Sequence, residues 1–186
     1  MLGEEDSGKT SIIIAYLKNE FNYGTIRTTG IDSYYIKLKF DNLEYKLKIF
    51  DSIGQERNRS ISTATTQKAD GIAMVFSVDD NRSYSVIVNW IKNIKEYANL
   101  EEKVLFIIGN KIDVKPEERL IKKEEVEEFA KKMNAKYFET SALTRQGINE
   151  AFEELFKEVY ERYKIKNIKP NYQKIQNLFT LIKKII

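Results

Sequence analysis

The sequence predicts an α/β fold in which a mostly parallel β-sheet has helices on both faces. Two continuous apolar segments, residues 71–78 and 104–109, are typical of buried parallel strands, and stretches with helical periodicity alternate with them. A glycine-containing phosphate-binding pattern opens the chain and leads into the first helix. Polar motifs follow the predicted strands directly, so we expect them at the carboxyl edge of the sheet, where open α/β sheets bind ligands.

Composition narrows the classes of function. The 186 residues are enough for one domain with a substantial core, and the balance of 42% hydrophobic and 32% charged residues is typical of a soluble globular protein. A net charge of +3 does not favour nucleic acid as a partner. The chain has no cysteine, which excludes thiolate chemistry, and no histidine, so catalysis must depend on positioning, electrostatics, Gln, carboxylates or a metal.

The phosphate-binding pattern is Gly3-Glu4-Glu5-Asp6-Ser7-Gly8-Lys9-Thr10, which matches G-x-x-x-x-G-K-[ST]. Its glycines let backbone N–H groups approach phosphates closely, and the following helix directs its positive end at the same anion. Lys9 should reach the β- and γ-phosphates, and the Thr10 hydroxyl should bind Mg²⁺. The alternative is an ordinary turn before a helix. The predicted phosphate contacts are Glu5, Asp6, Ser7, Gly8, Lys9, Thr10 and Ser11.

Only Met1 and Leu2 precede this loop, although such loops normally follow a buried strand. Two residues are too few for a strand. We therefore expect exposed core surface and unpaired ladder groups at this place, unless the sequence is truncated there or another segment fills the gap.

The remaining elements follow from hydrophobic periodicity. Alternation over residues 34–40 and 45–50, around a turn at Asp41-Asn42, predicts a hairpin. In its first strand, Tyr35, Lys37 and Lys39 share one side, and Ile36, Leu38 and Phe40 share the other. Residues 21–29 are expected to form a loop, and residues 136–140 a short strand. Helices are predicted over residues 9–20, 82–97, 116–133 and 148–163.

Asp51-Ser52-Ile53-Gly54-Gln55 follows the second strand of the hairpin. An aspartate here can hold Mg²⁺ directly or through water, and the N–H of Gly54 can approach the γ-phosphate. Gln55 can orient a water molecule for in-line attack without accepting a proton. The pattern alone is weak, because many turns have this spacing.

Two further motifs predict recognition of a base. In Asn110-Lys111-Ile112-Asp113, an ionised aspartate can accept from the two adjacent N–H donors that guanine presents and adenine lacks. The alternative is a solvated loop. A tight turn at Thr140-Ser141-Ala142-Leu143 can direct a backbone N–H at the guanine O6. The predicted base contacts are Asn110, Lys111, Asp113, Ser141, Ala142 and Leu143.

The order and spacing of these motifs resemble those of Ras-superfamily small GTPases, and most closely those of the Rab family. The resemblance extends from about Gly3 to Tyr163. It implies the fold of a P-loop NTPase small G-domain, with a six-stranded, mostly parallel sheet and five helices, here with its first strand missing or truncated. The motifs that carry it are Gly8-Lys9-Thr10, Thr28-Thr29-Gly30-Ile31-Asp32, Asp51-x-x-Gly54-Gln55-Glu56-Arg57, Asn110-Lys111-x-Asp113 and Glu139-Thr140-Ser141-Ala142.

This resemblance also implies a function. The protein would be a Mg²⁺-dependent switch that binds GTP and GDP, hydrolyses GTP and regulates vesicle traffic, in the cytoplasm and peripherally on endomembranes. Phe21 would pack on the guanine, Thr10, Thr28 and Asp51 would hold Mg²⁺, and Lys9 and Gln55 would be catalytic. The segments from Thr25 to Asp32 and from Gly54 to Lys68 would be the switches that bind effectors, exchange factors and GTPase-activating proteins.

Some residues depart from the family pattern. Glu5 stands where the family has a small residue beside the γ-phosphate, so we expect slower hydrolysis or weaker GTP binding, unless this side chain turns into solvent. Ile53 is bulkier than the family's alanine and would restrict the second switch. Asn58, Thr65 and Thr66 stand near positions where Rabs carry aromatic residues, which places binding of the usual Rab effectors in doubt.

We expect the nucleotide-binding domain to cover residues 1–164 and a basic tail to cover residues 165–186. The chain has no C-terminal cysteine for prenylation, and no acidic residue follows Glu161. Two interpretations of the tail stay open: it lies on an anionic membrane, or it packs on its own domain. Its apolar helical face consists of Ile175, Leu178, Phe179, Ile182, Ile185 and Ile186.

Two other functions stay open. The protein could bind guanine nucleotides as a scaffold without hydrolysing them, because Glu5 and the missing strand have ended turnover. An ATP-dependent P-loop enzyme is disfavoured by the guanine-type motif from Asn110 to Asp113.

Overall fold

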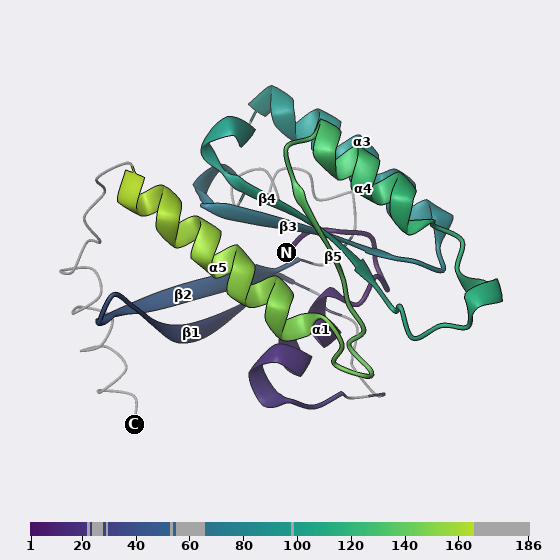
Figure 1. The fold of residues 1–186 in the computed structure, drawn as a ribbon, viewed down its shortest axis with the longest axis horizontal. Helices are drawn as coiled ribbons and strands as arrows, with labels where there is room; N and C mark the ends of the chain where they lie inside the picture. The colour runs from purple at the N-terminus through teal and green to yellow at the C-terminus, as the bar shows by residue number, and fades with distance from the viewer. Residues whose placement is uncertain are drawn as a thin grey trace.

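The computed structural model describes residues 1–21, 23, 28, 30–52, 54, 66–97 and 99–165. Parallel strands form its centre, and helices lie on both sides of them (Figure 1). The elements in chain order are α1 (Lys9–Lys18), β1 (Asp32–Phe40), β2 (Leu43–Asp51), β3 (Gly71–Ser77), α3 (Asn81–Tyr97), η2 (Leu100–Glu102), β4 (Val104–Asn110), η3 (Pro116–Glu118), α4 (Lys123–Lys132), β5 (Lys136–Glu139) and α5 (Ile148–Ile165).

The strands form two sheets. β3, β4 and β5 are parallel, in that order, and β1 and β2 form an antiparallel hairpin. Because the strands of the larger sheet run the same way, their last residues meet at one edge, where Ser77 is in register with Asn110 and Gly109 with Glu139. The predicted α/β class is therefore confirmed, and the motifs that follow these strands lie at the carboxyl edge.

Leu2 occupies part of the place where a first strand was expected. Its N–H donates to the Ala73 carbonyl at 2.8 Å, and its carbonyl accepts from the Val75 N–H at 2.7 Å, which makes a single parallel bridge to β3. On the other side, the Met1 nitrogen donates to the Phe50 carbonyl of β2. The described residues thus contain five strands and one bridge instead of six strands. The expectation of unpaired ladder groups is wrong for Ala73 O and Val75 N.

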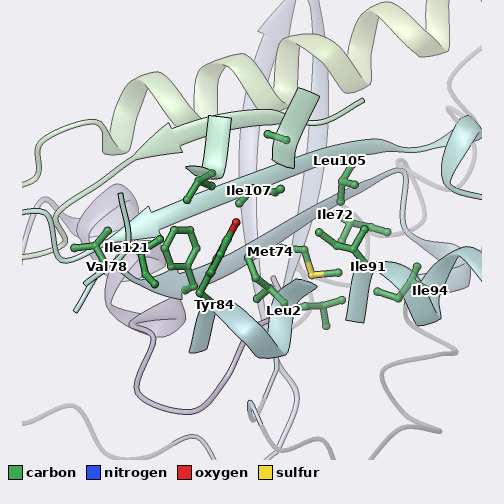
Figure 2. Close-up of a cluster of buried hydrophobic side chains, with 14 residues drawn as sticks. Leu2, Ile72, Met74, Val78, Tyr84, Ile91, Ile94, Leu105, Ile107 and Ile121 are labelled. Atoms are coloured by element: carbon green, nitrogen blue, oxygen red, sulfur yellow. The ribbon is translucent and has the colours of Figure 1, made fainter. Parts of the chain in front are cut away.

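Two apolar clusters cover the two faces of the larger sheet. Helices α3 and α4 cover one face, where Leu2 lies in the same cluster as Met74 and Ile91 (Figure 2). Helices α1 and α5 cover the other face. Alternate residues of β3 enter opposite clusters, as a strand buried on both sides requires. Within the described residues, no helix is both long and apolar enough to cross a membrane.

The charged helix predicted over residues 116–133 is divided into η3 and α4. The reason is a contact with Val78, the residue that follows β3: the N–H groups of Leu120 and Ile121 both donate to its carbonyl, at 2.9 and 3.0 Å. Ile121 is buried in the cluster beneath α3 and α4. A helix cannot continue through residues whose N–H groups bond to a distant strand, so α4 begins only at Lys123.

Helix α5 holds the tip of the hairpin. The Tyr160 ring stacks on Phe40 with centroids 4.7 Å apart, and the Tyr160 hydroxyl donates to Asp41 Oδ2 at 2.6 Å. Asp41 and Asn42 have φ angles of 45° and 64°, the left-handed pair that a two-residue hairpin turn needs. The predicted turn is therefore confirmed, and a tertiary contact fixes its position.

We predict that Leu2→Ala destabilises the fold by about 2–5 kcal/mol, the usual range for a core leucine. Leu2 is only 8% exposed and joins the cluster beneath α3. Urea unfolding followed by circular dichroism measures the change. Leu120→Ala is the matched control, because Leu120 is 53% exposed. Equal midpoints for the two variants would show that Leu2 contributes no core packing.

Candidate nucleotide-binding site

A pocket of about 280 Å³ opens at the carboxyl edge of the sheet. It brings together residues from the phosphate-binding loop, the segment after α1, and the turns after β2, β4 and β5. Most of its wall was predicted from the sequence, whereas Tyr23 and Ser52 were not. The lining residues are Glu5, Asp6, Gly8, Lys9, Thr10, Ser11, Phe21, Tyr23, Thr28, Ser52, Asn110, Lys111, Asp113, Ala142 and Leu143.

The glycines of the phosphate-binding loop are required by their surroundings. A Cβ on Gly8, whose φ is 88°, would lie 2.2 Å from Asn110 Nδ2. A Cβ on Gly3 would lie 2.1 Å from the Val75 carbonyl oxygen. Asp6 also has a left-handed backbone, with φ of 60°, a conformation that Asp tolerates better than most residues. The loop therefore turns tightly and packs directly against β3 and the end of β4.

Lys9 lies at the centre of the loop. Its side chain is buried, and Nζ donates to the carbonyls of Gly3 at 3.1 Å and Glu4 at 2.9 Å. Burial lowers the pKa of the Lys9 ammonium, and nearby carboxylates, Asp51 foremost, oppose this shift. A buried ammonium gains from a further negative charge, so this position suits a phosphate.

Asp51, Thr10 and Thr28 form an oxygen-rich cluster beside Lys9. The Thr10 hydroxyl donates to Asp51 Oδ2 at 2.5 Å and lies 3.0 Å from the Thr28 hydroxyl. Asp51 is fully buried, and its Oδ1 has no hydrogen-bond partner among the described residues. Burial raises the pKa of this carboxyl, although the Thr10 hydrogen bond opposes the shift. An unpaired buried carboxylate oxygen beside two hydroxyls suits a hard cation such as Mg²⁺.

Gly54 packs on the phosphate-binding loop. Its φ is 79°, and a Cβ there would lie 2.7 Å from both the Glu5 backbone nitrogen and Lys9 Nζ. A larger residue would therefore push the chain away from the loop. This close approach brings the Gly54 backbone next to Glu5 and Lys9, which both line the pocket.

Asn110 connects three segments of the site. Its Nδ2 donates to the Ser7 carbonyl of the phosphate-binding loop at 3.0 Å. Its Oδ1 accepts from the Thr140 hydroxyl and from the Ala142 N–H, each at 3.2 Å. Asn110 is itself buried. The predicted contact of Asn110 with a base is therefore accompanied by a structural role, which the sequence motif did not reveal.

The two turns that are predicted to recognise a base are held together by Asp113 and Ser141. The Ser141 hydroxyl donates to Asp113 Oδ1 at 2.5 Å and accepts from the Thr144 N–H at 2.9 Å. The Phe21 ring also lines the pocket and meets the Tyr23 ring edge to face, with centroids 4.9 Å apart. Aromatic side chains and Asp113 thus line the same pocket.

Two acidic residues of the loop, Glu4 and Glu5, have different surroundings. The Glu5 side chain is half-buried and lines the pocket. Glu4 does not line it and pairs with Arg82 of α3 at 3.4 Å.

Thr66, predicted near an effector surface, is buried instead. Predictions for Gln55, Ile53, Asn58, Thr65, residues 25–27 and the tail over 166–186 fall outside the described residues.

Comparison with known proteins identifies the family. A sequence profile described as the Ras family matches residues 1–161. The chain belongs to the Ras family. It is a Rab-like small GTPase, as the motifs predicted.

Individual relatives of this GTPase agree with that assignment. Ras-related protein SEC4 of Candida albicans is 32% identical over 168 residues, which cover 90% of this chain and 79% of the relative. Ras-related protein Rab-13 of Bos taurus is 35% identical over 159 residues, which cover 86% of this chain and 77% of the relative. Ras-related protein SEC4 of Saccharomyces cerevisiae is 33% identical over 162 residues, which cover 87% of this chain and 74% of the relative.

We predict that Asn110→Ala both destabilises this GTPase and weakens its binding of nucleotide. The variant leaves three polar groups without their partner, and each unsatisfied buried group costs about 1–3 kcal/mol. The dissociation constant for fluorescent methylanthraniloyl-GDP should rise by about 10–100-fold.

Asn89→Ala, at an exposed position of α3, is the matched control and should bind as the unchanged protein does. Unchanged binding by Asn110→Ala would contradict the role of Asn110 as a connection between the loop and the two turns.

Proposed function

We propose that this GTPase is a Mg²⁺-dependent switch that alternates between GTP and GDP and regulates vesicle traffic. The observation that supports the proposal most strongly is a single pocket that is lined by Lys9, Thr10 and Asp113. The buried Asp51 lies behind its wall and accepts a hydrogen bond from Thr10. Lys9 and the loop would bind the phosphates, and Asp113 would accept hydrogen bonds from guanine. Phe21 and the stem of Lys111 would cover the faces of the base.

The metal would be held by oxygen atoms of Thr10, Thr28 and Asp51. Mg²⁺ prefers hard oxygen ligands, and the unpaired Oδ1 of Asp51 supports this assignment. The ion would neutralise phosphate charge when bound. Gln55 would orient the attacking water, and Lys9 would stabilise the charge that develops on the phosphate oxygens.

Residues 25–32 and 54–68 would respond to the terminal phosphate and bind effectors, exchange factors and GTPase-activating proteins. The close approach of Gly54 to Glu5 and Lys9 supports a connection between the second segment and the phosphate. We propose a cytoplasmic location with peripheral binding to endomembranes. The nucleotide domain would cover residues 1–164, and the basic tail beyond it would contact anionic lipid or the domain itself.

The second candidate is a guanine-nucleotide-binding protein that hydrolyses GTP slowly or not at all. The Glu5 side chain lines the pocket and supports it. A carboxylate about 5 Å from a phosphate charge costs roughly 3 kcal/mol at an effective dielectric constant of about 20. Both candidates bind nucleotide, and turnover separates them.

The first test of this function is titration with methylanthraniloyl-GDP and methylanthraniloyl-GTP, with and without EDTA. We expect tight binding that weakens when EDTA removes Mg²⁺ and that unlabelled ATP does not compete away. Asp113→Asn should weaken GDP binding by about tenfold or more, because an amide offers one acceptor and a donor where guanine needs acceptors. Equal competition by ATP and GTP would contradict guanine recognition.

We predict that Glu5→Gly raises the rate of single-turnover GTP hydrolysis or the affinity for GTP by about 10–100-fold, after screening of the repulsion by solvent. Rapid quench of preformed GTP complex measures the rate. Glu4→Gln is the matched control, since this loop carboxylate pairs with Arg82 and does not line the pocket. If the two variants have the same hydrolysis rate and the same affinity for GTP, the Glu5 carboxylate neither slows hydrolysis nor weakens GTP binding more than Glu4 does.

A further inference from the structure

Two exposed apolar side chains lie in the wall of the nucleotide pocket. Tyr23 is 85% exposed and Leu143 is 41% exposed, and both line the pocket. In the described part of the chain, the other large hydrophobic side chains that are exposed are Tyr35, Leu43 and Leu120, and none of these lines it. A single exposed apolar residue needs no explanation, but two in the wall of one pocket indicate a ligand with an apolar part.

The end of α1 brings Tyr23 to this place. Helix α1 ends at Lys18, and Asn19 has the left-handed conformation, with φ of 58°, in which many helices end. Asn19 Oδ1 accepts a hydrogen bond from the guanidinium group of Arg145, which lies beyond the turn after β5. This contact ties the segment before Phe21 to the segment that carries one of the two predicted base-recognition turns.

The Tyr23 ring is placed by Phe21 but is hardly covered by it. The two rings meet edge to face, with centroids 4.9 Å apart and an angle of 85° between their planes. This arrangement is favourable for aromatic pairs, whose centroids lie about 4.5–7 Å apart. A base that packs on Phe21 would therefore also lie within reach of the Tyr23 ring.

The large exposed fraction of Tyr23 favours a contact with a ligand over a role in folding alone. A ring that only stabilises the fold is itself covered by the fold, whereas Tyr23 keeps 85% of its surface accessible. Burial of apolar surface is favourable roughly in proportion to the area removed from water. Most of that gain at Tyr23 is therefore still available to a molecule that enters the pocket.

The pocket divides its chemistry between a polar part and an apolar part. Lys9 offers a positive charge to phosphate, while Phe21, Tyr23 and Leu143 offer apolar surface. Every base has a π face, so contact with an aromatic ring strengthens binding without selecting one base. Tyr23 would thus contribute affinity, whereas Asp113 would select guanine.

We propose that the Tyr23 ring contacts the base and ribose of the bound nucleotide and slows its release. The sequence motifs assign no contact to this residue. The inference rests on the proposed function, because it takes a guanine nucleotide as the ligand. It adds to that function a side chain that determines how long the nucleotide stays bound.

The experiment measures release of tritiated GDP from the full chain by filter binding after addition of excess unlabelled GDP. Tritium is used because a methylanthraniloyl group on the ribose would itself lie near Tyr23. We expect Tyr23→Ala to release GDP about tenfold faster or more, the size of effect that loss of a base–aromatic contact produces. Tyr23→Phe keeps the ring and should release GDP as the unchanged chain does. Association rates should change little.

Inorganic pyrophosphate tests which part of the nucleotide Tyr23 contacts. It has the phosphates of GDP but neither base nor ribose. As competitors of tritiated GDP, unlabelled GDP should have a higher inhibition constant for Tyr23→Ala than for the unchanged chain, and pyrophosphate should have the same constant for both. An equal rise for the two competitors would contradict a contact with the base and ribose.

Two further variants complete the test. Tyr35→Ala is the matched control, because Tyr35 is 49% exposed and does not line the pocket, and its release rate should be unchanged. Tyr23→Ala is also measured in the Phe21→Ala background. A direct contact predicts that Tyr23→Ala still speeds release there. No further effect in that background would show that Tyr23 only supports Phe21, which would overturn the proposal.

The remaining outcomes separate this inference from the proposed function. If the unchanged chain binds GDP and Tyr23→Ala releases it at the same rate, the inference fails and the switch stands. Release from Tyr23→Phe that is as fast as from Tyr23→Ala would show that the ring is not the contacting group. If the unchanged chain does not bind tritiated GDP, both the inference and the proposed function are rejected.

Discussion

The site depends on the buried amide of Asn110. Its nitrogen holds the phosphate-binding loop at Ser7, 103 residues away in the sequence, and its oxygen holds the turn after β5 at Thr140 and Ala142. An amide can do both because it carries a donor and an acceptor on one rigid group. Gly8 must lack a side chain because this amide lies against it. One residue at the end of β4 therefore holds the phosphate-binding loop and the turn after β5 in a fixed relation to each other.

Two buried charged groups, Lys9 in the wall of the pocket and Asp51 behind it, are poorly stabilised by the fold alone. Burial moves the pKa of Lys9 downward and that of Asp51 upward, which means that both ionised forms lose solvation. An anion beside Lys9 and a cation beside Asp51 would restore favourable interactions for both. Stability and ligand binding are thus expected to be coupled, because a ligand that binds only the folded state stabilises it.

The β1–β2 hairpin contributes to the wall around the pocket and also presents an accessible, charged outer side. Its inner side packs on the core beneath α5, and Tyr160 of that helix fixes the turn through Phe40 and Asp41. Its ends lead to the pocket, since β1 begins four residues after Thr28 and β2 ends at Asp51. Its outer side remains accessible and carries lysines ordered by aromatic rings. The hairpin thus connects the oxygen cluster of Thr10, Thr28 and Asp51 to a charged outer surface.

The sequence by itself determined the family, the α/β class and most residues of the pocket. These follow from local information: motif spacing sets backbone geometry, and periodicity sets which side of each strand or helix is buried. Tertiary structure decided the rest. It divided residues 116–133 because Val78 binds Leu120 and Ile121, and it paired Leu2 with β3. It also turned Glu4 toward Arg82 while Glu5 lines the pocket, and it brought Tyr23 and Ser52 to the wall. These outcomes depend on contacts between distant residues, which no local pattern encodes.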